Sequence, residues 1–172
     1  TLGGDLNAET TGDGNIIIGN LSAVNATSAN YNVVMGHNAA RCITTGDYNV
    51  VFGPYAGQCN RGSYNFIAGY NALTGSGTAA DNTGGCNIAL GLSAGKCLTS
   101  GHSNVIMGCN GGKSITTGVA NVFAGPNAGK NFTTGSYNIV FGRAACHSGT
   151  ATGNNNIIMG DYAARCITSG AD

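Results

Sequence analysis

The sequence predicts an all-β fold: a parallel β-solenoid, or β-roll, of about nine 17-residue coils. Three observations predict it. A motif of Asn, three apolar residues and Gly recurs nine times, and most copies stand 17 residues apart. Gly makes up 30 of the 172 residues, which is typical of a chain with many tight turns. A unit this short cannot bury its own core, so successive units are expected to stack as coils.

The repeat covers the chain, so residues 1–172 are expected to form a single repeat array with no second domain. The stretches "TTGDYNVVFG" at 44–53 and "TTGSYNIVFG" at 133–142 illustrate how closely two copies agree. The widest interval, 22 residues between Asn65 and Asn87, predicts a loop insertion near residues 75–83. The Asn residues that mark the nine copies are Asn15, Asn32, Asn49, Asn65, Asn87, Asn104, Asn121, Asn138 and Asn156.

Each copy is expected to contain two short strands, because β-branched runs bounded by Gly and Asn are typical of strands. The first strand comprises the three apolar residues after the Asn, at 16–18, 33–35, 50–52, 66–68, 88–90, 105–107, 122–124, 139–141 and 157–159. The second runs from a small residue near Ala39, Ala94 or Ala128 to Ile43, Leu98 or Phe132. Coils stacked at the strand spacing of about 4.8 Å would form a rod roughly 40 Å long.

Side-chain alternation along the first strand divides its residues between two faces. The first and third residues share a face, and we expect them to form the inner core. The middle residue points the other way and is apolar in all nine copies. An exposed apolar stripe of this length indicates an interface. The oligomer interface predicted in this way comprises Ile17, Val34, Val51, Ile67, Ala89, Ile106, Phe123, Val140 and Ile158. The alternative is a monomer with a covered stripe, but no segment is long enough to cover nine coils.

The repeats resemble those of known surface fibres. The stretches "NVVFGPYAG", "NVIMGCNGG", "NVFAGPNAG" and "NIALGLSAG" are similar to the head repeats of trimeric autotransporter adhesins and, more closely, to repeats of phage tail-fibre proteins. The resemblance covers essentially the whole chain, although the period is longer than in the adhesin heads and Cys is more frequent. It implies three chains, each a left-handed parallel β-roll, that pack around a threefold axis with apolar strand residues inside.

Several function classes are not expected from the composition and the motifs. The seven acids and three His residues recur in no common column, and no nucleophile elbow, P-loop or Cys-x-x-Cys pair occurs. We therefore expect no enzyme, no catalytic residues, no cofactor and no metal site. The formal net charge is zero, whereas nucleic-acid binders carry a basic excess. No stretch approaches the roughly 20 apolar residues of a membrane span, so no membrane insertion is expected.

Two columns of the repeat predict contacts between neighbouring coils. The Asn column is expected to form a hydrogen-bonded ladder that holds each turn. Cys42 and Cys59 lie in one column on adjacent coils, with Cys97 and Cys166 further along it. Their Cα atoms should be about 5 Å apart, which is within disulfide range. A stack of small, buried thiols is the alternative, and we favour it because Cys97 has no adjacent partner.

Two further columns form a candidate ligand surface. One is basic and holds Arg41, Lys96, Lys113, Lys130 and Arg165, which would form a positive ridge able to attract anionic polysaccharide. The other is aromatic and holds Tyr31, Tyr48 and Tyr64, together with Tyr137, whose rings could stack on sugars. Each column also has a structural interpretation, which we favour: a solvated, charged edge for the first and packing over turns for the second.

The sequence therefore predicts a structural segment of an extracellular, cell-surface or virion fibre. By the resemblance it would be a homotrimer, and a surface glycan or receptor would be its second partner. Three rivals remain open. Thr-Thr pairs at 44–45, 116–117 and 133–134 suggest a monomeric ice-binding solenoid, although flat ice-binding faces usually carry two Thr in a T-x-T pattern. The others are a polysaccharide-processing enzyme built on the rod and a filament of rods stacked end to end.

Overall fold

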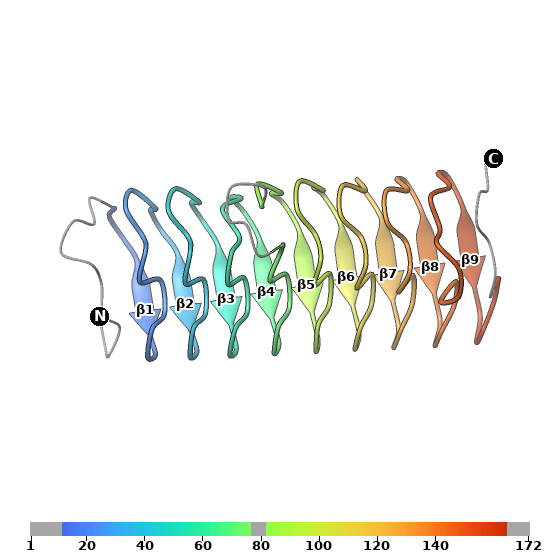
Figure 1. The fold of residues 1–172 in the computed structure, drawn as a ribbon, viewed down its shortest axis with the longest axis horizontal. Coiled ribbons are helices and arrows are strands. Elements are labelled where there is room, and N and C mark those ends of the chain that lie inside the picture. The colour runs from blue at the N-terminus through green and yellow to red at the C-terminus, as the bar shows by residue number, and fades with distance from the viewer. Residues whose placement is uncertain (1–11, 77–81, 165–172) are drawn as a thin grey trace.

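A computed structural model describes residues 12–76 and 82–164 of the chain as a rod built on one parallel sheet. The sheet has nine strands, which pair in chain order from β1 to β9 (Figure 1). The strands are β1 (Ile16–Ile18), β2 (Val33–Met35), β3 (Val50–Phe52), β4 (Phe66–Ala68), β5 (Ile88–Leu90), β6 (Val105–Met107), β7 (Val122–Ala124), β8 (Ile139–Phe141) and β9 (Ile157–Met159). These are the nine first strands that the repeat predicts.

Equivalent residues of the repeat lie beside one another in the sheet. Val34 pairs with Val51, and Ile106 pairs with Phe123, with no slip in register at any strand. The chain therefore forms a β-solenoid of about eight turns, and the described residues contain no helix. The register holds even across the 22-residue interval, where β4 pairs directly with β5. The predicted loop insertion near 75–83 is only partly described, because residues 77–81 lie outside the described part of the chain.

The predicted second strand of each coil is wrong, because these segments are turns. In the second coil, residues 37–42 form consecutive turns, and Asn38 and Ala40 have left-handed φ values of 53° and 47°. The amides of Ala39 and Ile43 bond to carbonyls three residues back in the same coil. Outside the named strands, Phe132 forms an isolated bridge with Ala151. Alternating left-handed residues bend the chain too sharply for a ladder of strand pairs, and small residues and Gly permit this bend.

The core lies inside each coil, between the sheet and the layer of turns. The middle residue of every strand points into it and is at most 5% exposed. The predicted oligomer interface is therefore wrong: Ile17, Val34, Val51, Ile67, Ala89, Ile106, Phe123, Val140 and Ile158 form the interior of the single chain. They pack against small residues of the turn layer, such as Ala39 and Ala94, and against larger ones such as Ile115 and Phe132. The face expected to form the inner core points outward instead.

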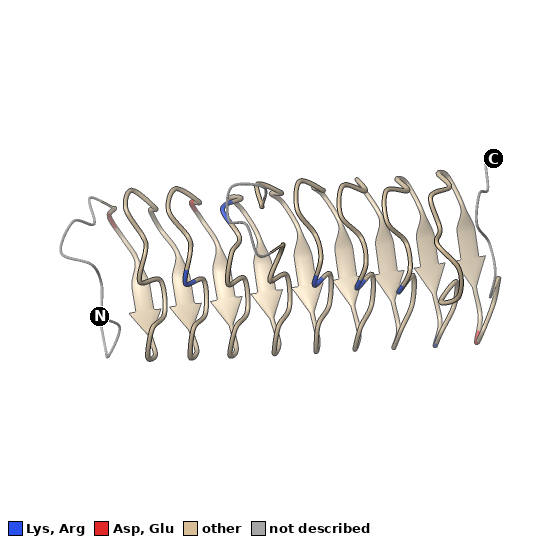
Figure 2. Ribbon diagram, in the orientation of Figure 1, with Lys and Arg blue, Asp and Glu red and all other residues tan. Residues whose placement is uncertain are grey.

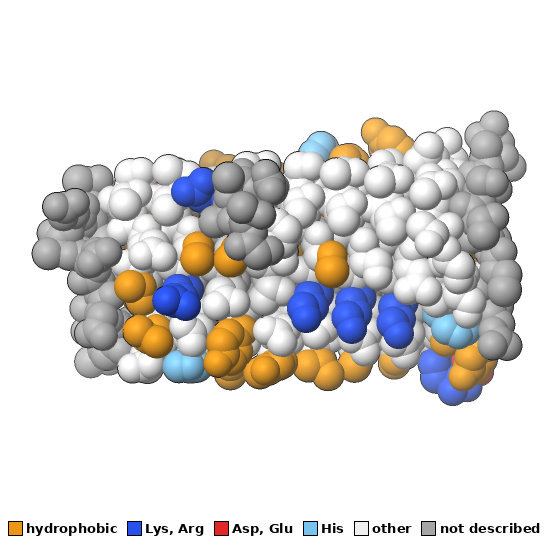
Figure 3. All heavy atoms as spheres, in the orientation of Figure 1, with side chains coloured by type: hydrophobic (Ala, Val, Ile, Leu, Met, Phe, Trp, Pro, Cys, Tyr) orange, Lys and Arg blue, Asp and Glu red, His pale blue; other side chains and the backbone are white. Residues whose placement is uncertain are grey.

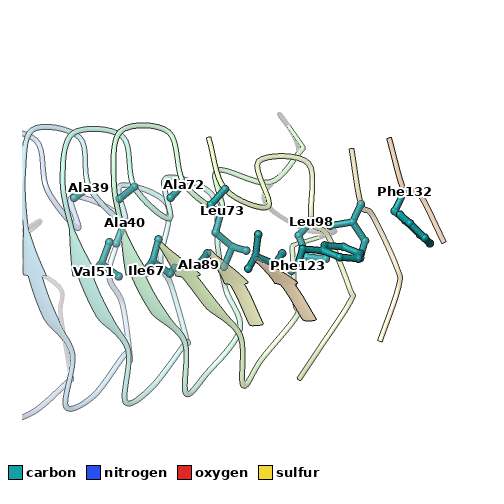
Figure 4. Close-up of a cluster of buried hydrophobic side chains, with 14 of the residues drawn as sticks. Ala39, Ala40, Val51, Ile67, Ala72, Leu73, Ala89, Leu98, Phe123 and Phe132 are labelled. Carbon is teal, nitrogen blue, oxygen red and sulfur yellow. The ribbon is translucent and has the colours of Figure 1, made fainter. Parts of the chain in front are cut away.

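Inside the narrow coil, large side chains lie opposite small ones (Figure 4). Phe123 is the largest inward residue of the sheet, and Gly occupies the facing turn position in its own coil and in the coil before it. A Cβ at Gly129 would lie 2.7 Å from the Phe123 ring, and one at Gly112 would lie 2.6 Å from it. Where the strand residue is small, at Ala89, Leu73 extends into the core. Close packing of this kind requires that a larger side chain at one position be balanced by a smaller one at the facing position.

A continuous ladder of Asn side chains runs through the interior, as predicted. In each of eight links, the later Asn donates from its backbone N and its Nδ2 to the Oδ1 of the preceding one, at 2.8–3.1 Å. Asn104 Nδ2 also donates to the Gly118 carbonyl of the next coil. The seven internal Asn residues are at most 2% exposed. Buried amides must be hydrogen-bonded to be tolerated, and this ladder satisfies them.

The Gly that ends each strand allows neighbouring coils to approach closely. Gly36 has a φ of 143°, which L side chains rarely adopt, and a Cβ there would lie 2.5 Å from the Gly53 carbonyl oxygen. Gly142 stands in the same relation to Gly160. Any larger residue at this corner would push two coils apart.

Candidate functional site

The outward face of the sheet is a uniform apolar surface that extends over all nine strands. Each of the nine strands contributes its first and third residues, and all eighteen side chains are apolar. They include Phe52, Met107 and Phe141, which are 36%, 39% and 41% exposed. We call these eighteen side chains the sheet face: Ile16, Ile18, Val33, Met35, Val50, Phe52, Phe66, Ala68, Ile88, Leu90, Val105, Met107, Val122, Ala124, Ile139, Phe141, Ile157 and Met159.

The backbone places these side chains in two straight rows. In-register pairing puts every first residue beside the first residue of the next strand, and every third beside the next third. The rows therefore repeat at the strand spacing of about 4.8 Å along the rod. A sheet with one face in water usually alternates apolar and polar residues, whereas strands covered on both faces are apolar throughout. The sheet face has the composition of the second kind.

A stack of tyrosines occupies the coils of β2 to β4, just before each strand. The ring centroids of Tyr31 and Tyr48 are 5.1 Å apart, as are those of Tyr48 and Tyr64, and the ring planes differ by 14° and 8°. All three residues have left-handed φ values between 55° and 61°. Because the rings face one another, both faces of Tyr48 are covered. This leaves no free ring face on Tyr48, which favours the structural interpretation of the aromatic column over stacking on sugars. Tyr137 stands in the same column four coils beyond Tyr64.

A second aromatic row lies just after the strands, at the corner where the chain turns. His37 meets Tyr55 edge to face at 5.5 Å, and Tyr55 meets Tyr70 in the same way at 5.7 Å. Hydrophobic side chains gather along the lower edge of the rod in Figure 3, on the side where the strands end. Together with the tyrosine stack, this row borders part of the sheet face with aromatic residues.

The basic column lies in the turn layer, across the core from the sheet. Lys96, Lys113 and Lys130 occupy adjacent coils, whereas Gln58 and Thr74 separate Arg41 from them. Figure 2 places the basic residues of these coils on the turns that lie in front of the strands, and Figure 3 shows their side chains in a row. The structure thus brings three of the five predicted basic residues together. Arg165 lies outside the described residues.

The cysteine pair and the Thr-Thr pairs also lie outside the sheet, in the turns and loops of the coils. Cys42 and Cys59 are free thiols with Sγ atoms 3.8 Å apart. Burial, and then the neighbouring thiol, raises the pKa of Cys59 to about 11. In two of the Thr-Thr pairs, the hydroxyl of the first Thr donates to a backbone carbonyl of the next coil: Thr116 Oγ1 to Thr133 at 3.1 Å and Thr133 Oγ1 to Ala151 at 3.5 Å. The second residue, such as Thr117 or Thr134, is exposed.

Sites for other chemistry are sparse in the described part of the chain. Residues 12–76 and 82–164 hold no group of three or more His, Cys, Asp or Glu side chains placed to bind a metal ion. Within the same ranges, no helix is long and apolar enough to cross a membrane. One ion pair occurs among them, in which Arg143 donates to Asp161 Oδ2 at 2.7 Å. That contact raises the pKa of Arg143, whose guanidinium also lies 4.8 Å above the Tyr162 ring.

The sheet face was missed as an outward surface because the strands have no polar residue to indicate which side faces water. One signal did distinguish the columns. All three Met residues and three of the five Phe residues stand in the first and third columns, whereas the middle column is mostly Val, Ile and Ala. A coil of 17 residues is too narrow to hold a large side chain at every level. Comparisons of this chain with protein-family models, with curated proteins and with solved structures found no match.

Proposed function

We propose that this chain is a structural segment of an extracellular, cell-surface or virion fibre, and that its copies associate through the sheet face. The observation that supports the proposal most directly is the sheet face itself, with eighteen apolar side chains and no charged one. Removing one large apolar side chain from water contributes roughly 1.5–3 kcal/mol. Two rows of such residues along a rod provide the driving force for a permanent assembly.

A second copy of the same chain is the partner that matches this face best. Each copy carries the same two rows at the same spacing, so side chains of one copy can enter the gaps between side chains of another along the full length. No charge in either row opposes the approach. The resemblance to trimeric fibre repeats favours three copies around a common axis, with the sheet faces inside and the turn layers outside. In this role the chain acts mechanically, as a stiff spacer with adhesion as a secondary task, and performs no catalysis.

Ice binding is the main rival role, and the threonines argue against it. In the pairs at 116–117 and 133–134, the hydroxyl of the first Thr donates to a backbone carbonyl of the neighbouring coil, and the second Thr is the exposed one. A single file of hydroxyls provides half of the usual flat array. A thermal-hysteresis measurement on the purified chain tests this rival directly, and we expect no hysteresis.

The chain number of the purified protein tests the proposal. We expect light scattering to give three chains, with a single species that persists on dilution. The double variant Phe52→Glu/Met107→Glu places two charges on the sheet face without touching the core, since both side chains point outward. We expect this variant to be a monomer with an unchanged β-type circular dichroism spectrum.

The matched control is Thr117→Glu/Thr134→Glu, which adds the same two charges at exposed positions of the turn layer. We expect it to retain the chain number of the unmodified protein. A monomeric unmodified protein, or a control that dissociates as readily as the sheet-face variant, would contradict the proposal.

A further inference from the structure

Among residues 82–160, which the structure describes throughout, the row formed by Lys96, Lys113 and Lys130 has no acidic counterpart. Between residues 82 and 160 the sequence contains four Lys and Arg residues and no Asp or Glu. The nearest described carboxylate beyond this range, Asp161, already binds Arg143. Figure 3 accordingly shows a line of basic side chains with no acidic side chain beside it. Three like charges in adjacent coils repel one another unless an external anion neutralises them.

The backbone fixes the spacing of the row. The amide of Cys97 donates to the Lys113 carbonyl at 3.0 Å, and the amide of Ser114 donates to the Lys130 carbonyl at the same distance. The three lysines are thus held in register at the coil spacing, about 4.8 Å, and extend over roughly 10 Å. Each follows a buried Gly, so no large side chain rises directly before them. The result is a straight, open ridge parallel to the rod axis.

The ridge also lies where an assembled fibre would leave it accessible. It belongs to the turn layer, and the core separates it from the sheet face (Figure 2). Copies that associate through the sheet face therefore keep their lysine rows on the outside. A ligand could bind along the row without competing with self-association.

We propose that the lysine row binds an extended anionic polysaccharide that lies along the rod. A linear polymer with regularly repeated sulfate, phosphate or carboxylate groups can contact all three ammonium groups at once, whereas a small anion contacts one or two. A polynucleotide fits less well. Proteins that bind single strands stack the bases on aromatic faces. The coils of β5 and β6 contain no Phe, Tyr or Trp, and Phe123 and Phe132 in the coil of β7 are buried. This ligand would give the proposed fibre its adhesive role, and its test is independent of the chain number.

Calorimetric titration of the full chain with dextran sulfate, and with neutral dextran of the same length, tests the inference. We expect binding to dextran sulfate only. Because about three cations are neutralised, the logarithm of the affinity should fall with the logarithm of the salt concentration with a slope of about −2 to −3. The variant Lys113→Gln/Lys130→Gln should weaken binding at least tenfold and reduce the slope to about −1. Gln is compatible with the fold here, since Gln58 stands in the same column.

The control variant Arg61→Gln/Arg143→Gln removes two positive charges outside the basic column, and we expect it to bind within about twofold of the unmodified chain. Equal weakening by both variants would overturn the inference, because the attraction would then come from overall charge. Equal binding of neutral dextran, or tighter binding of single-stranded DNA with the same number of charges, would overturn it as well. Light scattering on the same samples reports self-association separately, so a failure of one proposal leaves the other open to its own test.

Discussion

The coils of β2 to β4 and the coils of β5 to β8 share the same strand register and the same Asn ladder, but they carry different side chains. The first group holds the tyrosine stack and the Cys42–Cys59 pair. The second holds the lysine row and the Phe123–Phe132 contact in the core, with ring centroids 5.2 Å apart. Links of the Asn ladder have the same geometry in both, for example between Asn32 and Asn49 and between Asn104 and Asn121.

This difference separates the positions that determine the fold from those that are free to vary. The Asn ladder and the Gly at each strand end recur in every coil, and the backbone follows them. The column of Tyr31 continues as Cys86, Ser103 and Ala120, all with left-handed φ values between 54° and 60°. A stack of aromatic rings is therefore not needed to hold that conformation. Surface columns can change from one half of the rod to the other while the coil remains the same.

Removal of one Asn from the ladder should have the largest effect, and it should be equal in the two halves. Asn121→Ala deprives the Asn138 backbone N and the Gly135 carbonyl of buried partners. Each buried group left unsatisfied costs about 1–3 kcal/mol, so we expect a loss of roughly 4 kcal/mol of unfolding free energy. Asn49→Ala should cost the same, and urea unfolding monitored by circular dichroism measures both. If one variant lost less than about half of the unfolding free energy that the other lost, the ladder would not stabilise the two halves of the rod equally.

A methyl group added in the turn layer should lower the unfolding free energy more in the second half of the rod than in the first. At Gly129 the new Cβ would lie within 3.0 Å of three atoms of the Phe123 ring, which cannot move aside. Overpacking of this kind costs about 1–3 kcal/mol beyond the strain of a left-handed Ala. At Gly57 the nearest atom is the flexible end of Ile67, at 3.0 Å, and Ala40 already occupies the same position in the preceding coil. We expect Gly129→Ala to lower the unfolding free energy by about 3 kcal/mol and Gly57→Ala by about 1 kcal/mol.

If Gly129→Ala and Gly57→Ala lowered the unfolding free energy equally, the Phe123 ring would not require a Gly at the facing position. The variant Phe123→Val/Gly129→Ala provides a further check. A smaller strand residue should restore part of the stability that Gly129→Ala removes, because the added methyl group would then have space.

The thiol pair should produce the smallest effect, a pH dependence confined to the first half. The pKa of Cys59 in the folded chain is about 11, above its ordinary value of 9.0. Below pH 9 the thiol is protonated in both states and stability is unaffected. Between pH 9 and about 11 the unfolded chain loses this proton first, so stability falls as the pH rises. The difference in unfolding free energy between the unmodified chain and Cys59→Ser should shrink or reverse over this interval. A constant difference from pH 8 to 11 would contradict the raised pKa, and alkylation of Cys59 should be slow at pH 8 for the same reason.

The sequence was sufficient to predict the period, the nine strands, their register and the Asn ladder, since all four depend on which residues recur. It was not sufficient to assign the faces. A strand such as Val50–Phe52 is apolar at every position, so alternation tells which residues share a side but not which side is inside. The second strand was predicted wrongly for a related reason. Left-handed conformations at Asn38 and Ala40 are imposed by the closure of a 17-residue coil, and neither residue indicates them alone. The three adjacent lysines were found because a column is visible in the repeat.

The hydrogen bonds of the Asn ladder all run in one direction. In each bond between two Asn residues, the Oδ1 atom of the earlier coil accepts from the Asn of the later coil, so a completed coil presents this acceptor to residues that follow it in the chain. The sequence of bonds along the ladder therefore matches the order in which residues leave the ribosome. Each new coil can form on the one before it during synthesis, without waiting for the distant end of the chain.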